Sequence, residues 1–246
     1  MLKVLLSVKV IVKMILKGNK QKHITMKTIR LYTLFVLLMV LAFSSCTAKK
    51  GFVTKLPKQE ITDVQRFPIM SDIYALDKND NGYRSDSLSL LSVQCVNNYL
   101  DKQTNIDITK NIEVNDTTLL RMVSDEIRGL SETAFDNKEI ALIPIPHTID
   151  SLLEVQGKRF GLLIYANGFE RYEKNRLKAF NQALIMMQGG ATLNPYYDYF
   201  STISLFIVDS SNNNIAFYNH SKIEERPSRQ YCIDRHFMEL YYRYWR

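Results

Sequence analysis

The stretch FGLLIYA at residues 160–166 decides the fold, because it carries no charge and is apolar on both faces of an extended chain. A strand with one face in water alternates apolar and polar residues, whereas a strand covered on both faces does not. Residues 140–145 are apolar in the same way, and residues 203–208 nearly so. We therefore predict three strands that are buried between layers of helices.

Amphipathic helices are predicted around these strands, where apolar residues recur every three or four positions. They cover residues 86–99, 116–130, 149–155 and 170–188, and a last helix begins near Pro227. In the segment 170–188, an apolar stripe is expected to face the core, and it consists of Leu177, Phe180, Leu184 and Met187.

Alternation of strands and helices is typical of βαβ units around a parallel sheet. An additional first strand is predicted within residues 67–76, and a turn at 210–214 leads into a final antiparallel strand at 215–219. The predicted fold is α/β: a single three-layer domain over residues 66–246, with a mainly parallel sheet, helices on both faces and a carboxy-terminal antiparallel hairpin at the edge.

A targeting segment precedes this domain. Residues 31–43 are uncharged, Lys27 and Arg30 stand before them, and Ser44-Ser45-Cys46 follows. Thirteen residues are too few for a membrane-spanning helix, which needs about 20, so the pattern predicts a secretory signal peptide. Its end resembles the lipobox of bacterial lipoproteins, except that Phe43 stands where that family prefers Leu. The resemblance implies that Cys46 carries a palmitate-type lipid anchor and becomes the first residue of the mature chain.

The resemblance also divides the rest of the chain and places it in the cell. Met26 opens an ordinary signal peptide over 26–45. We therefore predict that Met1 is a mis-assigned start and that residues 1–25 lie upstream of the true one. Residues 46–65 carry Lys, Gly and Pro without periodicity and are predicted to form a flexible tether. Thr47 is not the Asp of inner-membrane lipoproteins, and no acidic cluster follows it. The expected location is the outer membrane, facing the periplasm.

Charge and cysteine content exclude other classes. The net charge of +7 includes eight Lys and Arg in residues 1–45, where no acid occurs. Without these eight, 24 of the 32 basic residues remain against 25 acidic ones, a net charge of −1. We therefore predict no nucleic-acid partner. Cys95 and Cys232 do not form a disulfide scaffold, and we predict that they stay unpaired.

Polar residues at the predicted strand ends form one candidate ligand pocket. In open α/β sheets, ligands bind outside the carboxyl ends of the strands. The candidate residues are His147, Asn167, Glu170, Arg171 and Asp209. They could perform acid–base chemistry if they converge. The alternative is that they are solvated residues of ordinary loops.

A partial calcium motif is interpreted as a turn. Asp77-x-Asn79-x-Asn81-Gly82 matches the first half of an EF-hand loop, but Leu88 stands where a bidentate Glu is needed. We predict a turn at Asn81-Gly82 and no metal site.

No recognised catalytic, phosphate-binding or dinucleotide-binding motif is present, so no catalytic residue and no cofactor are predicted. Aromatic runs at 196–200 and 241–245 could anchor a protein partner. The sequence favours a membrane-anchored, non-enzymatic binding or assembly module of the cell envelope. The alternative is an enzyme or small-ligand-binding protein that uses the strand-end pocket. The element order also resembles the amino-terminal α/β domains of TolB-like and CsgG-like envelope proteins.

Overall fold

A computed structural model describes residues 53–54, 56–136, 139–187, 196–241 and 244, all of which belong to the compact unit that begins at Lys50. The predicted signal peptide, Cys46 and Trp245 lie outside the described residues. Within the described part, no helix has the length and hydropathy to cross a membrane.

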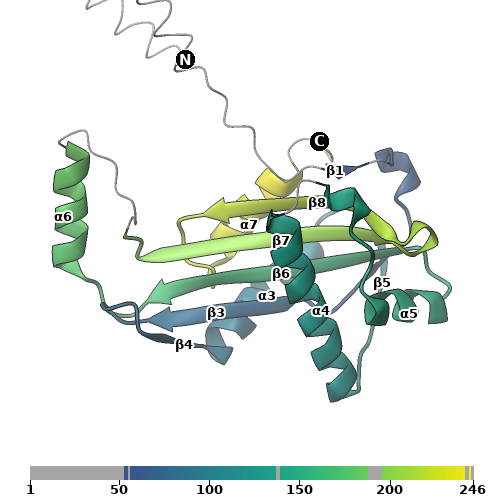
Figure 1. Cartoon of the computed structure of the whole chain (residues 1–246), viewed down its shortest axis with the longest axis horizontal. Coiled ribbons are helices and arrows are strands. Elements are labelled where there is room, and N and C mark those ends of the chain that lie inside the picture. The colour runs from purple at the N-terminus through teal and green to yellow at the C-terminus, as the bar shows by residue number, and fades with distance from the viewer. Residues whose placement is uncertain (1–52, 55, 137–138, 188–195, 242–243, 245–246) are drawn as a thin grey trace, which may run out of the picture. The chain divides into compact units, whose positions relative to one another are not determined.

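The described residues form a mixed sheet of eight strands (Figure 1). The strands are β1 (Val53–Thr54), β2 (Val64–Arg66), β3 (Met70–Leu76), β4 (Gly82–Arg84), β5 (Ile108–Asn111), β6 (Phe160–Arg171), β7 (Tyr199–Asp209) and β8 (Asn214–Ile223). The order is β1-β8-β7-β6-β2-β5, and β3 also pairs with β6 and carries β4 at its outer edge. Pairs β2–β5, β2–β6 and β3–β6 are parallel, whereas β3–β4, β6–β7, β7–β8 and β1–β8 are antiparallel.

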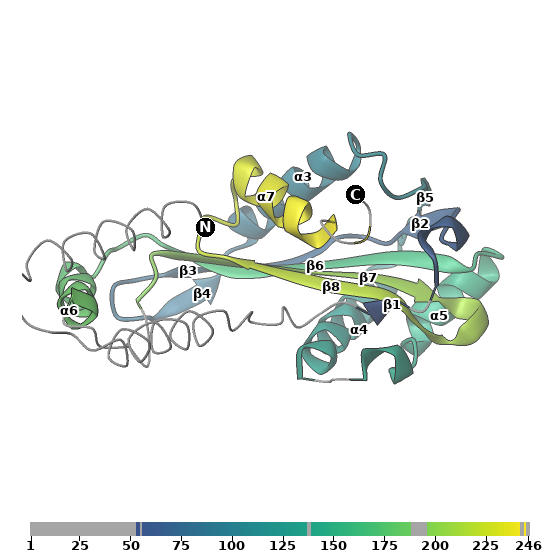
Figure 2. The same ribbon diagram turned by 90° about the horizontal axis from the view of Figure 1, so that it is seen from above.

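Helices cover both faces of the sheet (Figure 2). One face carries α3 (Asp86–Leu100) and α7 (Gln230–Tyr241), and the opposite face carries α4 (Thr117–Asp136) and α5 (His147–Val155). A separate apolar cluster fills each interface. The helix α6 (Arg176–Met187) lies beyond the end of the sheet and belongs to neither layer. The three-layer α/β class and the carboxy-terminal antiparallel hairpin are therefore confirmed.

The helix α5 owes its position to a carboxylate from α4. The Glu126 carboxylate accepts hydrogen bonds from the backbone N–H groups of Thr148 and Ile149, at 3.0 and 3.1 Å. These donors belong to the first turn of a helix, where they have no partner within the helix. A negative charge also interacts favourably with the positive end of the helix dipole. Glu126 thus fixes the two helices of this layer against each other.

The prediction of a strand at 140–145 is wrong. Residues Ile140–Leu142 form a single 3-10 turn, and Ile140 and Ile145 are buried in the cluster beneath α4 and α5. Pro144 and Pro146 have no backbone N–H to donate to a strand ladder, so this apolar run cannot join the sheet.

The expected crossover between the second and third buried strands is also absent. β6 and β7 pair in antiparallel register along their whole length, so α6 does not return the chain to a parallel neighbour. The predicted inward stripe of α6 is solvent-exposed, and Leu177 and Phe180 retain 70% and 60% of their accessible surface.

The segment predicted as a tether lies partly within the fold. β1 pairs with β8, and β2 lies between β5 and β6. Val64 is fully buried, and Ile61 is 5% exposed. Strands of two or three residues are too short to display an apolar period, which is why the sequence did not reveal them. The signal-peptide and domain boundaries upstream of these strands stay a prediction.

The two cysteines are free, as predicted. Cys232 is buried in α7, and burial raises the pKa of its thiol to about 12. The thiol of Cys95 donates to the carbonyl oxygen of Ser228 at 3.7 Å. Neither thiol is poised to ionise near neutral pH, so neither has the character of a nucleophile.

Candidate functional site

The five residues of the predicted strand-end pocket do not converge. The antiparallel register sets Asp209 opposite Phe160, whereas Glu170 lies opposite Tyr199. The two positions are separated by ten residues of β6, or about 33 Å of extended strand. Asp209 therefore lies at one end of the sheet, and Glu170 and Arg171 lie at the other.

Each of these residues has its own surroundings. His147 is the exposed first residue of α5, and Asp209 is buried and pairs with the partly exposed guanidinium of Arg159. Glu170 accepts a hydrogen bond from the backbone N–H of Ser228 at 3.2 Å, on the sheet face that α7 covers. Arg171 follows on the opposite face, because successive residues of a strand alternate.

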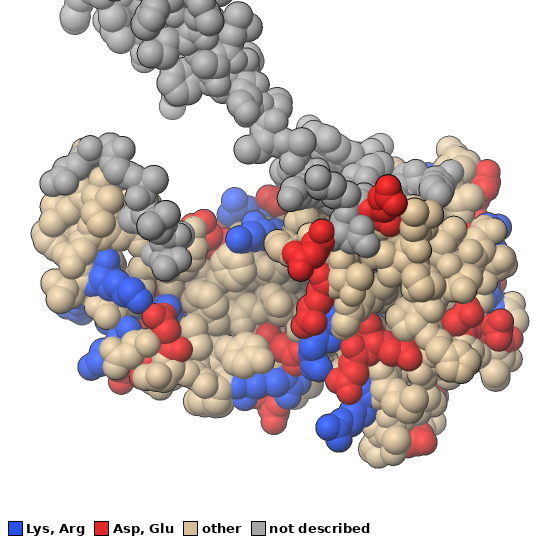
Figure 3. Space-filling view, in the orientation of Figure 1, with Lys and Arg blue, Asp and Glu red and all other residues tan. Residues whose placement is uncertain are grey.

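Asn167 belongs to a part of the sheet that none of the described helices covers. We call this part the open face and define it by Asn167, Phe169, Phe200, Thr202 and Lys222, from β6, β7 and β8. These residues occupy the same face as the core beneath α4, and they lie beside the last turns of that helix. Figure 3 shows the open face as a hollowed, largely uncharged area between α6 and α4.

The hollow has a volume of about 360 Å³ and is bounded by the last turns of α4. Phe135 of α4 forms its rim and is 59% exposed. Phe169 and Phe200 stack with their centroids 5.9 Å apart, and the ammonium of Lys222 lies 4.8 Å from the Phe200 centroid. Tyr197 lies 6.1 Å from the same ring. The open face is therefore an aromatic platform with a polar margin, a composition that is typical of binding surfaces.

The carboxylate of Asp72 ties three strands and α4 together beside this platform. One oxygen accepts a hydrogen bond from Arg84 Nε at 2.6 Å, and the other accepts from Arg128 Nε at 3.0 Å and Tyr165 Oη at 2.9 Å. Burial alone would raise the pKa of Asp72, but the bonds from Arg84, Tyr165 and Arg128 outweigh burial and hold that pKa below 3.8. Asp72 therefore stays charged and rigidly held.

A histidine under the rim is kept neutral. His220 lies 5.6 Å from Phe135 and 5.9 Å from Tyr218 between ring centroids. Burial, followed by the charge of Lys222, lowers the pKa of His220 below its usual 6.5. Within the described residues, no group of three His, Cys, Asp or Glu side chains could hold a metal ion. The open face is thus bordered by aromatic rings and a neutral imidazole.

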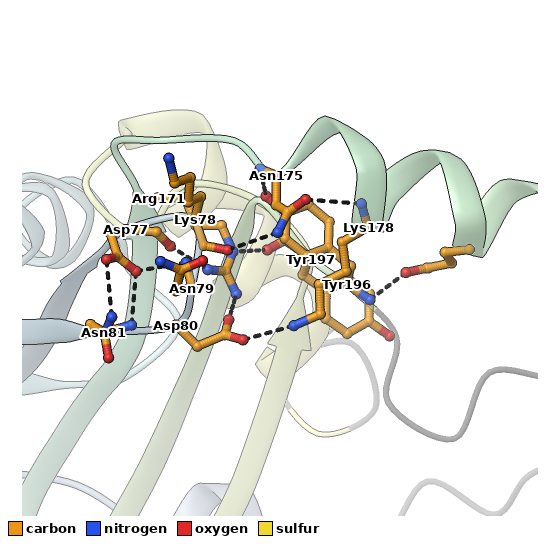
Figure 4. A network of polar contacts seen from close by, with 11 residues as sticks. Asp77, Lys78, Asn79, Asp80, Asn81, Arg171, Asn175, Lys178, Tyr196 and Tyr197 are labelled. Atoms are coloured by element: carbon orange, nitrogen blue, oxygen red, sulfur yellow. Dashed lines mark hydrogen bonds and ion pairs between the residues drawn. The ribbon is translucent and has the colours of Figure 1, made fainter.

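The loop at 77–81 joins β3 to β4 and is closed by its own side chains (Figure 4). One carboxylate oxygen of Asp77 accepts hydrogen bonds from the backbone N–H groups of Asn79 and Asn81, at 2.7 and 2.9 Å. The other oxygen accepts from Asn81 Nδ2 at 3.1 Å. The half EF-hand motif therefore forms the turn of a hairpin, in which an Asp side chain mimics backbone contacts.

The residues that sequence reasoning missed come from separate elements. Phe135, Phe169 and Asp72 reach this region from α4, β6 and β3, and no local motif links them. The aromatic run 196–200 and the polar Asn167 after a buried strand were the available indications.

Comparisons with known proteins give only distant matches. No protein-family model matches the chain, and no curated protein matches it. The C-terminal domain of LpoB from Salmonella enterica has 9% sequence identity, covers 70% of this chain and 86% of its own, and has a TM-score of 0.29. A dodecameric PelC from Paraburkholderia phytofirmans has 6% identity, covers 78% of this chain and 93% of its own, and has a TM-score of 0.34. A second PelC dodecamer structure has 8% identity, coverage of 78% and 94%, and a TM-score of 0.33. These scores are too low to support an assignment of function.

Proposed function

We propose that the mature chain is a lipid-anchored lipoprotein of the cell envelope that binds a protein partner through the open face. The observation that carries the proposal is the stacked Phe169–Phe200 platform, which a three-layer fold would normally cover with a helix. Aromatic rings that are partly exposed in a hollow act as anchors in protein interfaces. We propose the lipid anchor because a basic, then apolar, then small-residue pattern ends at Cys46. We propose the outer membrane because Thr47, and not Asp, follows that cysteine.

Acylation of Cys46 can be tested directly. Cells that produce the full chain are labelled with a palmitate analogue, and the wild-type protein is expected to carry the label while Cys46→Ser does not. Cys95→Ser is the matched control and is expected to label as the wild type does, because Cys95 packs against the apolar cluster beneath α3 and α7. Label that persists in Cys46→Ser would contradict a lipid anchor at this residue.

The binding surface is tested by photo-crosslinking in cells. A photoreactive amino acid at Thr202, on the open face, is expected to give a discrete crosslinked protein product. The same group at Met238, which is 51% exposed on α7 at the other side of the sheet, is expected to give none. Equal products from both positions, or none from Thr202, would contradict the proposal.

A further inference from the structure

The helix α6 presents its apolar side chains to solvent and a polar one to the protein. Among its residues, only Gln182 is partly buried. The stripe of Leu177, Phe180, Leu184 and Met187 retains 70%, 60%, 40% and 83% of its accessible surface. Amphipathic helices of folded domains normally bury such a stripe. The stripe therefore lacks its packing surface within the described part of one chain.

Polar contacts hold α6 in this orientation (Figure 4). Lys178 Nζ lies 2.8 Å from a carboxylate oxygen of Asp80, and Asn175 Nδ2 donates to the carbonyl oxygen of Lys78 at 3.2 Å. Gln182 accepts a hydrogen bond from the backbone N–H of Tyr196. The contacts of Lys178 and Asn175 join the 77–81 loop to the start of this helix, and Gln182 joins its polar side to the chain at Tyr196. The apolar stripe therefore faces away while these contacts persist.

Arg171 connects the same loop to the chain that returns from α6. Its guanidinium donates to the carbonyl oxygens of Asp77 and Tyr197 at 2.7 and 2.8 Å, and it also pairs with Asp80. The side chain is 5% exposed. Because both ends of the α6 segment are tied to the loop, α6 cannot lie on the open face of its own chain without breaking this network.

The open face and the stripe of α6 both present apolar side chains. The open face is the next helix position beside α4 on the sheet, and its floor consists of the Phe169 and Phe200 rings. The stripe of α6 runs along the whole helix and consists of Leu, Phe and Met side chains. Exposed apolar surfaces of this kind mark interaction sites. One chain thus carries both a vacant helix position and a helix that lacks a partner surface.

Their charges are complementary. Glu132 and Asp136 lie at the C-terminal end of α4, and Arg176 lies at the N-terminal end of α6. Each charge is unfavourable next to the dipole of its own helix. None of the three forms an ion pair within the residues that the structure describes. In an antiparallel arrangement of α6 beside α4, Arg176 would meet these acids and relieve both unfavourable contacts.

We infer that α6 of one copy of this protein docks on the open face of a second copy. The inference rests on the proposed function, because it names the partner of the same surface. The interface joins two different patches, so each copy keeps one free patch, and repetition yields a ring or a linear array. α6 is then a connecting helix between copies.

Disulfide trapping between two differently tagged full-length copies tests this inference. One copy carries Ala183→Cys, beside the stripe of α6, and the other carries Thr202→Cys on the open face. The pair is expected to give a mixed dimer at about tenfold the yield of a control pair, Ala183→Cys with Met238→Cys. Adding Leu184→Glu to the α6 copy is expected to abolish the product, because it places a charge in the apolar contact.

Charge reversal tests the register of the contact. Arg176→Glu is expected to lower the trapped dimer about threefold, and Asp136→Arg in the other copy is expected to restore it. No dimer above the control pair would overturn the inference. A Thr202 crosslink to a different protein, with no trapped dimer, would overturn it while leaving the proposed function intact. Labelling of α6 by a lipid-borne photoreactive probe, with no trapped dimer, would assign the stripe to the membrane and also overturn it.

Discussion

Asp72→Asn is expected to lower the free energy of unfolding by about 3 kcal/mol, because it removes the charge that holds two guanidinium groups and a phenol in one place. Asp72 is 5% exposed, and its partners come from β4, α4 and β6. An amide can accept one of these bonds, but it sets an NH₂ group against an arginine. This loss of stability is at the low end for buried ion pairs, because the side chains of Arg84 and Arg128 are 48% and 38% exposed.

Urea denaturation at several pH values measures this effect. The pKa of Asp72 is lower in the folded protein than its usual 3.8, so its charge stabilises the fold fully above that value. The stabilisation is lost as the pH falls through the lowered folded-state pKa, and the difference between wild type and Asp72→Asn should shrink there. Asp125→Asn removes an exposed partner of Arg128 and is the matched control, expected to change stability by less than about 0.5 kcal/mol. Equal effects of the two substitutions would contradict this role of Asp72.

Asp209→Asn is expected to destabilise the fold by about 2–3 kcal/mol, because the Asp209 carboxylate is fully buried and accepts hydrogen bonds from a charged guanidinium. Arg159 Nε and Nη2 donate to its two oxygens at 2.9 and 2.7 Å, and Asn212 Nδ2 donates at 2.7 Å. These bonds close the turn between β7 and β8. The residue that the sequence placed in a ligand pocket thus has a structural role.

Thermal unfolding of Asp209→Asn and His147→Ala separates the two interpretations of the strand-end residues. His147 is exposed on α5, so its substitution is expected to leave the midpoint within the error of the wild type. A pocket function would require the opposite result for Asp209: an unchanged midpoint together with a lost cellular phenotype.

The longest periodic and apolar segments were predictable from sequence. The helices over 86–99 and 116–130 and the buried strands at 160–166 and 203–208 all exist. Their patterns are local, since burial on one or both faces is recorded in the spacing of apolar residues. The run at 140–145 failed because two prolines, rather than hydrophobicity, decided its backbone.

The candidate site was only partly predictable. Asn167 and the aromatic run at 196–200 were identified, but not their neighbours Phe135 and Phe169 on other elements. The sequence also assigned Asp209 to the same end of the sheet as Glu170. Apolar spacing indicates which faces of a strand are buried but contains no information on the direction of its neighbour, and the antiparallel β6–β7 register separated the two residues.

The sequence by itself determined that this protein has an α/β fold with a doubly covered sheet, because that information lies in the spacing of apolar residues. It also determined that α6 is amphipathic. Only the tertiary structure decided where the apolar stripe of α6 points. Two polar contacts turn this stripe away from the domain: Lys178 pairs with Asp80, and Gln182 accepts a hydrogen bond from the backbone N–H of Tyr196. The first of them depends on a loop about a hundred residues earlier in the chain. A helical period shows that a face must be buried, whereas only the three-dimensional arrangement shows that its own chain does not bury it.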